Sequence, residues 1–267
     1  MTARPIRRVL EAGEGPAIVL VHGWSADADF FAPQLALAEA GFHVLAPDLP
    51  GHGPEAPPDR TLDIADLSDS VAVWLAERRI ERPLLVGWSM GAAVLLDLLA
   101  RPGAPAAAGL AILDMSPKPA NDRDWRHGLA SGHDRAGMEA QTPAMAKDWS
   151  RLAPPIARAL FAAGREPDPA LLAFAERRMT SRDGPTMAKL WRSLAAFDGR
   201  AALDRIACPI TTVGGGRSRV YGWALDAWYA ARPGIARAFV LEDAGHALQL
   251  EAPARLNQIL AACRATP

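Results

Sequence analysis

The sequence predicts an α/β domain in which a mostly parallel central sheet is flanked by helices on both faces. Short apolar runs alternate along the chain with longer amphipathic stretches, and each run ends where polar or Gly-rich residues begin. This alternation is typical of buried parallel strands joined by helical crossovers. The expected strands span residues 17–21, 42–46, 84–86, 110–113, 210–213 and 238–241, and the clearest helical patterns between them span residues 64–79 and 92–100.

Length and composition agree with a globular domain of this size. The chain has 267 residues, of which 50% are hydrophobic and 22% are charged. Such a chain can bury a substantial core. The formal net charge of −1 provides no general attraction to nucleic acid or to an anionic membrane, so we expect neither as a partner.

The cysteine content and the N-terminus favour a cytoplasmic protein. Cys208 and Cys263 are too few for a disulfide framework, which suits a reducing compartment. The first apolar run, residues 18–21, is far too short for a signal sequence or a membrane span.

One region interrupts the alternation of strands and helices. Residues 116–200 contain no convincing strand, but they carry helical patterns at 169–179 and 186–196. This region directly follows the expected strand that ends at Asp114. We therefore expect a helical cap (116–200) inserted into a core formed by residues 1–115 and 201–267.

The candidate nucleophile is Ser89, in the pentapeptide Gly87-Trp88-Ser89-Met90-Gly91. A strand pattern precedes this Gly-x-Ser-x-Gly motif and a helix pattern follows it, which is the context of a nucleophile elbow. The turn is sharp, and the flanking glycines let strand and helix approach closely. An ordinary serine turn is the simpler alternative.

Two further motifs supply the expected base and oxyanion hole. His246, in Ala244-Gly245-His246, follows the last strand pattern and is the candidate general base. The backbone N–H groups of Trp24 and Met90 are the candidate oxyanion donors, because one donor follows the nucleophile and the other follows an earlier strand. We expect His22, which precedes Gly23, to be structural.

These motifs together resemble the α/β-hydrolase superfamily, with its central sheet, catalytic triad and cap inserted after the strand ending at Asp114. The resemblance rests on Val21-His22-Gly23-Trp24, on the segment 47–53, on the serine pentapeptide and on Ala244-Gly245-His246, which occur in the order of that superfamily. The pair His-Gly-Trp and Gly-Trp-Ser also resembles the esterases that act on pimeloyl-acyl-carrier-protein methyl esters.

The triad acid departs from the pattern that this resemblance implies. The superfamily usually carries an aspartate after the strand at 210–213, but Ser218 occupies that position here. Some members place the acid after the strand that ends here at Asp114, so we expect Asp114 to orient His246. Asp114 as a turn cap, Asp243 as the acid, and a serine–histidine dyad oriented by Ser218 or water remain alternatives. We expect Asp48 to hold the turn before Gly51.

The expected substrate is a medium-sized acyl or aromatic ester, and the chemistry needs no cofactor and no metal. The candidate substrate-binding residues are aromatic: Trp24, Phe30, Trp88, Trp125, Trp149 and Trp191. For each of them alone, core packing is the simpler role. Residues 116–200 contain 14 Lys/Arg and 10 Asp/Glu, so the cap could dock an acidic acyl carrier protein, although an ordinary solvated surface explains the same charges.

The motifs predict a carboxylic ester hydrolase with a Ser89–His246–Asp114 triad. They do not separate an esterase from a lactonase, thioesterase, amidase or carbon–carbon bond hydrolase of the same fold. A ligand-binding receptor with impaired turnover is the alternative from another class, and the serine at position 218 is its only support.

Overall fold

The computed structural model describes residues 3–53, 57 and 59–265. Its centre is a seven-stranded sheet in the order β1-β3-β2-β4-β5-β6-β7. All neighbouring strands are parallel except β1, which runs antiparallel to β3 at one edge. The strands are β1 (Val9–Ala12), β2 (Ala17–Val21), β3 (His43–Pro47), β4 (Leu84–Trp88), β5 (Gly109–Leu113), β6 (Ile210–Gly215) and β7 (Ile235–Leu241).

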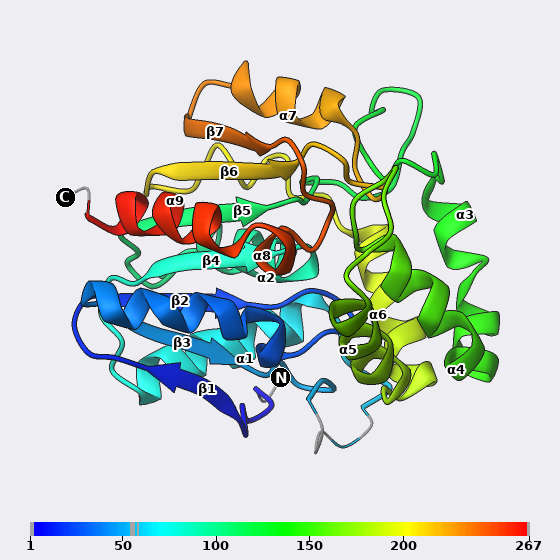
Figure 1. The fold of residues 1–267 in the computed structure, drawn as a ribbon, viewed down its shortest axis with the longest axis horizontal. Helices are drawn as coiled ribbons and strands as arrows, with labels where there is room; N and C mark the ends of the chain where they lie inside the picture. The colour runs from blue at the N-terminus through cyan, green and yellow to red at the C-terminus, as the bar shows by residue number, and fades with distance from the viewer. Residues whose placement is uncertain (1–2, 54–56, 58, 266–267) are drawn as a thin grey trace.

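The central strands are apolar on both faces because helices cover both faces. Every residue of β2, β4 and β5 is buried, as expected for parallel strands between two helical layers. The covering helices are η1 (Ala28–Ala40, a 3₁₀ helix), α1 (Ile64–Glu77), α2 (Met90–Leu99), α7 (Trp223–Ala230), α8 (Leu248–Glu251) and α9 (Pro253–Ala265). On one face of the sheet α9 packs against η1, and on the other face α1 packs against α2 (Figure 1).

Four helices between β5 and β6 form the cap. They are α3 (Arg135–Glu139), α4 (Thr142–Ala159), α5 (Pro169–Thr180) and α6 (Gly184–Ala196). Figure 1 shows them gathered beyond one end of the sheet, where the strands β4 to β6 finish. Because ligands bind at the carboxyl ends of parallel strands, the cap lies over the place where a site is expected.

The predicted fold class is confirmed, and the structure adds elements that the sequence patterns did not reveal. Strand β1 is a short edge strand of four residues whose register depends on β3. Helices η1 and α7 also lacked a recognised pattern; η1 contains Pro33 and is of 3₁₀ type. Within the described residues, no helix has both the length and the apolarity needed to cross a bilayer.

Candidate active site

Ser89 occupies the turn between β4 and α2 in a strained backbone conformation. Its φ is 52° and its ψ is −125°, a combination that a residue with a side chain rarely adopts. The turn is possible because strand and helix lie in contact at the flanking glycines. A Cβ on Gly87 would lie 2.4 Å from the Ala92 Cα, and one on Gly91 would lie 2.0 Å from the Val21 carbonyl oxygen.

His246 and Asp114 are joined by a hydrogen bond although 132 residues separate them. The Nδ1 of His246 lies 2.7 Å from Oδ2 of Asp114. Since an ionised carboxylate only accepts, Nδ1 carries the hydrogen and Nε2 is left free of it in the neutral ring. Both side chains are buried, with exposed fractions of 3% and 4%. Asp114 follows β5 directly, with a positive φ of 41°, so the end of that strand delivers its carboxylate to the site.

Ser218 contacts the same carboxylate. Its hydroxyl donates to Oδ2 of Asp114 over 2.7 Å, and the backbone N–H of Gly215 donates to Oδ1 over 3.0 Å. Ser218 Oγ in turn accepts from the backbone N–H of Val220 and Tyr221. The side chain at the usual aspartate position therefore serves Asp114 rather than His246, a role that the sequence analysis did not recognise.

The other two aspartates that the sequence brought forward lie elsewhere. The side chain of Asp243 is 78% exposed and pairs with Arg217 over 3.1 Å. Asp48 is buried, accepts from the backbone N–H of Ala28 over 2.7 Å and pairs with Arg8 over 3.1 Å. These contacts join the end of β3 to the start of η1 and to the N-terminal segment, and the expected role of Asp48 in the turn before Gly51 stays a prediction. Within the described residues, the carboxylate that forms a hydrogen bond with the His246 ring is that of Asp114.

The loop 22–25 lies directly over Ser89. A Cβ on Gly23 would be only 3.1 Å from the Cβ of Ser89, so glycine permits this approach. Trp24 follows Gly23, and Met90 follows Ser89 as the first residue of α2. An N–H at the first position of a helix has no intrahelical acceptor. The two expected oxyanion donors thus belong to the two segments that meet at Ser89.

His22 has the structural role predicted for it. Its Nδ1–H donates to the Gly23 carbonyl over 2.9 Å, and its Nε2 accepts from the Leu49 N–H over 2.9 Å. Burial lowers the pKa of the ring, which suits a neutral imidazole that donates at one nitrogen and accepts at the other.

A cavity of about 170 Å³ opens beside Ser89 and His246, between the core and the cap. Its wall is mostly apolar, and among the described residues that line it none is a Lys, Arg, Asp or Glu. The lining side chains from the cap include Met138, Gln141, Met145, Ile156, Leu160, Met179 and Trp191. The site is therefore suited to an uncharged, largely apolar group.

Three of the six aromatic residues predicted to bind substrate line this cavity, namely Trp24, Trp88 and Trp191. The other three pack elsewhere. Phe30 is fully buried and stacks on Trp88 with ring centroids 5.5 Å apart. Trp149 packs against Trp24 from outside the cavity wall.

Trp125 lies in a separate aromatic cluster with His127 and Trp228. Its indole N–H donates to the Lys118 carbonyl over 2.8 Å. These contacts give Trp125 the packing role that is the simpler explanation for a lone aromatic residue.

Two polar residues of the cavity wall escaped the sequence analysis. Tyr221 donates its hydroxyl to the Met115 sulfur over 3.0 Å, and burial raises the pKa of the phenol, which stays neutral. Gln141 joins the wall at the start of α4. Tyr221 follows the end of β6, a position where site residues are expected, whereas nothing in the sequence around Gln141 signals its place.

A strained serine between a strand and a helix of a mostly parallel sheet, beneath helices inserted between two later strands, defines an α/β-type hydrolase. The family model described as Alpha/beta hydrolase family matches residues 18–259. The chain belongs to this family, as the motifs predicted.

Individual relatives agree with this assignment. The chain is 29% identical over 253 residues to the pimeloyl-[acyl-carrier protein] methyl ester esterase of Aromatoleum aromaticum, covering 89% of this chain and 94% of that protein. The structure resembles an esterase from Exiguobacterium antarcticum, with a TM-score of 0.85, 19% identity and coverage of 97% and 95%. It also resembles the enol-lactonase from Burkholderia xenovorans, with a TM-score of 0.80, 22% identity and coverage of 96% and 95%. At these identities the two structures bear on the fold alone.

Proposed function

We propose that this protein is a serine esterase that cleaves carboxylic esters through an acyl-enzyme on Ser89. The observation that carries the proposal is the buried hydrogen bond between His246 and Asp114. His246 also lines the same cavity as Ser89, so the proposed base and nucleophile face one site. A histidine held in this tautomer can accept a proton at Nε2. The esterase names of the curated relatives support the same reaction class.

In the proposed mechanism, Ser89 Oγ attacks the ester carbonyl while His246 Nε2 takes the hydroxyl proton. The backbone N–H groups of Trp24 and Met90 donate to the oxyanion of the tetrahedral intermediate. The C–O bond to the alcohol then breaks, and His246 returns the proton to the leaving alkoxide. Water attacks the acyl-enzyme by the same route, which releases the acid and restores Ser89.

Asp114 orients His246 and stabilises the imidazolium that forms in each step. Ser218 and the N–H of Gly215 hold the carboxylate through its two oxygens. The acid in this proposal therefore comes from the end of β5.

The cavity favours an uncharged acyl group of medium size. A carboxylate placed against this wall would lose hydration without gaining a cationic partner, which costs several kcal/mol. A chain whose far end is neutral avoids that cost. We extend the proposal to an acyl group presented by an acyl carrier protein, because similar proteins are esterases of acyl-carrier-protein esters and residues 116–200 carry a net positive charge.

Hydrolysis of p-nitrophenyl butyrate by the wild type, Ser89→Ala and Ser150→Ala tests the proposal. Ser150 is an exposed serine of α4 and serves as the matched control. We expect Ser89→Ala to lower kcat at least about 10³-fold, and Ser150→Ala to leave it unchanged. Equal rates for the wild type and Ser89→Ala would refute the proposal, and absence of turnover with tight ligand binding would favour a receptor instead.

A panel of lactone, thioester, amide and ester substrates with one shared acyl group then identifies the scissile bond. For the carrier-protein extension, kcat/KM toward an acyl-carrier-protein ester is compared with that toward the free small ester at rising salt. If charge attraction drives docking, kcat/KM should fall with rising salt for the carrier-bound ester and stay constant for the free small ester.

A further inference from the structure

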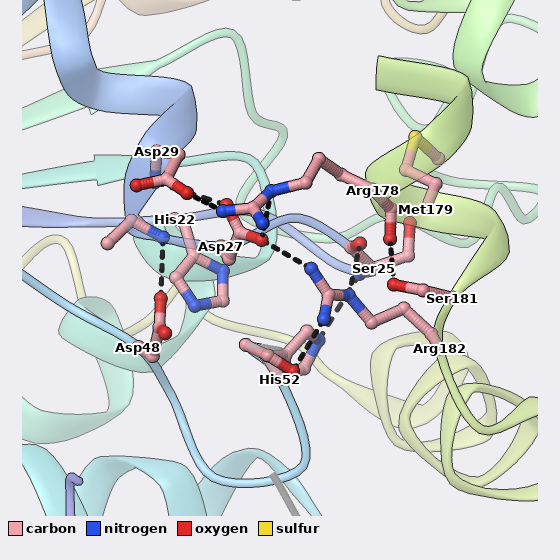
Figure 2. A network of polar contacts seen from close by, with 12 residues as sticks. His22, Ser25, Asp27, Asp29, Asp48, His52, Arg178, Met179, Ser181 and Arg182 are labelled. Carbon is pink, nitrogen blue, oxygen red and sulfur yellow. Dashed lines mark hydrogen bonds and ion pairs between the residues drawn. The ribbon is translucent and has the colours of Figure 1, made fainter. Parts of the chain in front are cut away.

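Arg182, in the turn between α5 and α6 of the cap, reaches across to the core beside the active site. Its guanidinium is buried, and each of its three nitrogens has an acceptor in the core. Nε donates to the Ser25 carbonyl over 3.2 Å, Nη1 to the Gly53 carbonyl over 2.6 Å and Nη2 to Oδ2 of Asp27 over 2.5 Å. Figure 2 shows this side chain directed from the cap toward Ser25, Asp27 and His52.

The loop that Arg182 holds is the one that carries the proposed oxyanion donor. Ser25 immediately follows Trp24 and has a φ of 61°, a strained value for a residue with a side chain. Its N–H donates to Nε2 of His52 over 3.2 Å, and its carbonyl accepts from Arg182. Both peptide groups flanking the Ser25 Cα are therefore fixed by buried partners.

His52 can accept this bond only as a neutral ring. Its Nδ1–H donates to the Pro50 carbonyl over 3.1 Å, which leaves Nε2 as the acceptor. Burial, the neighbouring His22 and the charge of Arg182 hold the pKa of His52 well below its usual value. The charge of Arg182 therefore also helps to keep the acceptor for Ser25 unprotonated.

The cap holds the same loop at a second point. The Trp24 indole N–H donates to the Met187 carbonyl of α6 over 3.0 Å, and its ring contacts Trp149 and Trp191 of the cap. Within the part of the chain that the structure describes, loop 22–25 is thus held by His22 and His52 from the core and by Arg182 and Met187 from the cap.

We propose that Arg182 is a positioning residue for catalysis: it fixes the Ser25 carbonyl and thereby the direction of the Trp24 N–H toward the oxyanion. This inference rests on the proposed esterase function. Arg182 does not line the cavity, so it affects the substrate only through the loop. A seated cap is then a requirement for a complete oxyanion hole.

A purely structural arginine would lower stability without a selective effect on the transition state. A misplaced donor weakens an interaction that forms only in the transition state, so kcat falls while KM changes little. Displacement of about 1 Å can cost on the order of 10²-fold in rate. We expect a reduction in kcat between about 10-fold and 100-fold when Arg182 is removed.

Arg178 provides a matched control. It is a second arginine at the end of α5 that forms ion pairs with Asp27 and Asp29, and it donates nothing to Ser25. Figure 2 shows the two guanidinium groups on either side of Asp27. Arg178→Met removes both of these cap-to-core ion pairs while leaving the bond between Arg182 and the Ser25 carbonyl in place.

The experiment compares Arg182→Met, Arg182→Lys and Arg178→Met with the wild type on p-nitrophenyl butyrate, at temperatures where each is folded by circular dichroism. We expect both Arg182 variants to lose kcat with KM within about twofold, and Arg178→Met to keep kcat. Affinity for a trifluoromethyl ketone, whose adduct carries an oxyanion, should fall in parallel with kcat/KM. Arg182→Lys keeps a cation beside Asp27, so it tests the proposal even where Arg182→Met does not fold.

The two hypotheses fail in different ways. If the wild type depends on Ser89 but both folded Arg182 variants keep kcat, the positioning role is overturned and the esterase proposal stands. If Ser89→Ala is as active as the wild type, both are overturned. Equal loss of kcat in Arg178→Met and Arg182→Met would assign the effect to the ion-pair cluster as a whole and would likewise overturn the specific role of Arg182.

Discussion

Ser218 donates its hydroxyl hydrogen to Oδ2 of Asp114 over 2.7 Å, the same oxygen that lies 2.7 Å from Nδ1 of His246. Asp114 follows β5 and Ser218 follows β6, and these two strands are neighbours in the sheet. A carboxylate can therefore approach His246 from the end of either strand. In this chain β5 supplies the carboxylate and β6 supplies a donor that holds it.

Removal of the Ser218 hydroxyl should weaken this support without breaking the hydrogen bond between Asp114 and His246. Ser218→Ala leaves Asp114 with the N–H of Gly215 and with His246, and it deprives the backbone N–H of Val220 and Tyr221 of an acceptor. We expect a loss of about 1–2 kcal/mol in the free energy of unfolding and a reduction of kcat of up to about 10-fold. Urea unfolding and steady-state kinetics measure the two effects, and unchanged values of both would contradict the role given to Ser218.

Relocation of the acid is a stronger test of the shared geometry. Asp114→Asn should lower kcat about 10³–10⁴-fold, because an amide allows the wrong histidine tautomer. The double variant Asp114→Asn/Ser218→Asp places a carboxylate at the end of β6 and should recover at least about tenfold of that loss. Ser218→Asp alone puts two carboxylates in contact and should be destabilised at neutral pH. Absence of recovery in a folded double variant would show that only the end of β5 can present the acid productively.

The tryptophans divide into two groups with different expected effects. Trp191 lines the cavity, so Trp191→Leu should raise KM for an aromatic ester several-fold and leave kcat within a few-fold. Trp125 packs outside the cavity, so Trp125→Leu should lower the melting temperature and leave both kinetic constants near the wild type. A raised KM in Trp125→Leu, with Trp191→Leu changing only the melting temperature, would contradict the cavity as described.

Asp226 should give stability a pH dependence of unusual sign. Burial, and then the negative charge of Asp114, raises the pKa of the Asp226 carboxyl to about 7. The ordinary pKa of this carboxyl is near 3.8, so between about pH 3.8 and pH 7 the unfolded chain loses the proton while the folded protein keeps it. The folded state then binds more protons, so its stability falls as pH rises through this interval.

Asp226→Asn removes this penalty and should be more stable than the wild type at about pH 8 by on the order of 1–2 kcal/mol, once partial exposure is considered. The advantage should shrink as the pH falls and vanish near about pH 3, where both states of the wild type are largely protonated. Melting temperatures at the two pH values measure it. Asp243→Asn, at an exposed side chain, is the control, and an advantage of Asp226→Asn that does not vary with pH would contradict the prediction.

The sequence by itself determined the fold class, the family, the strand order along the chain and the neighbourhoods of Ser89 and His246. It did so because these features are local. A fully apolar strand, a glycine-flanked turn and a helix pattern are each encoded within a few residues. Asp114 was predicted as the acid from the superfamily resemblance, and the prediction agreed with the position of its strand end at the ligand-binding edge of a parallel sheet.

The tertiary structure alone decided which side chains from distant segments meet. It placed Ser218 on Asp114 and directed Trp191 into the cavity while Trp125 packs elsewhere. It also brought Arg182 to Ser25 across 157 residues. Such contacts depend on the relative position of the cap and the core, which results from packing over the whole interface and is not encoded in any short pattern of residues.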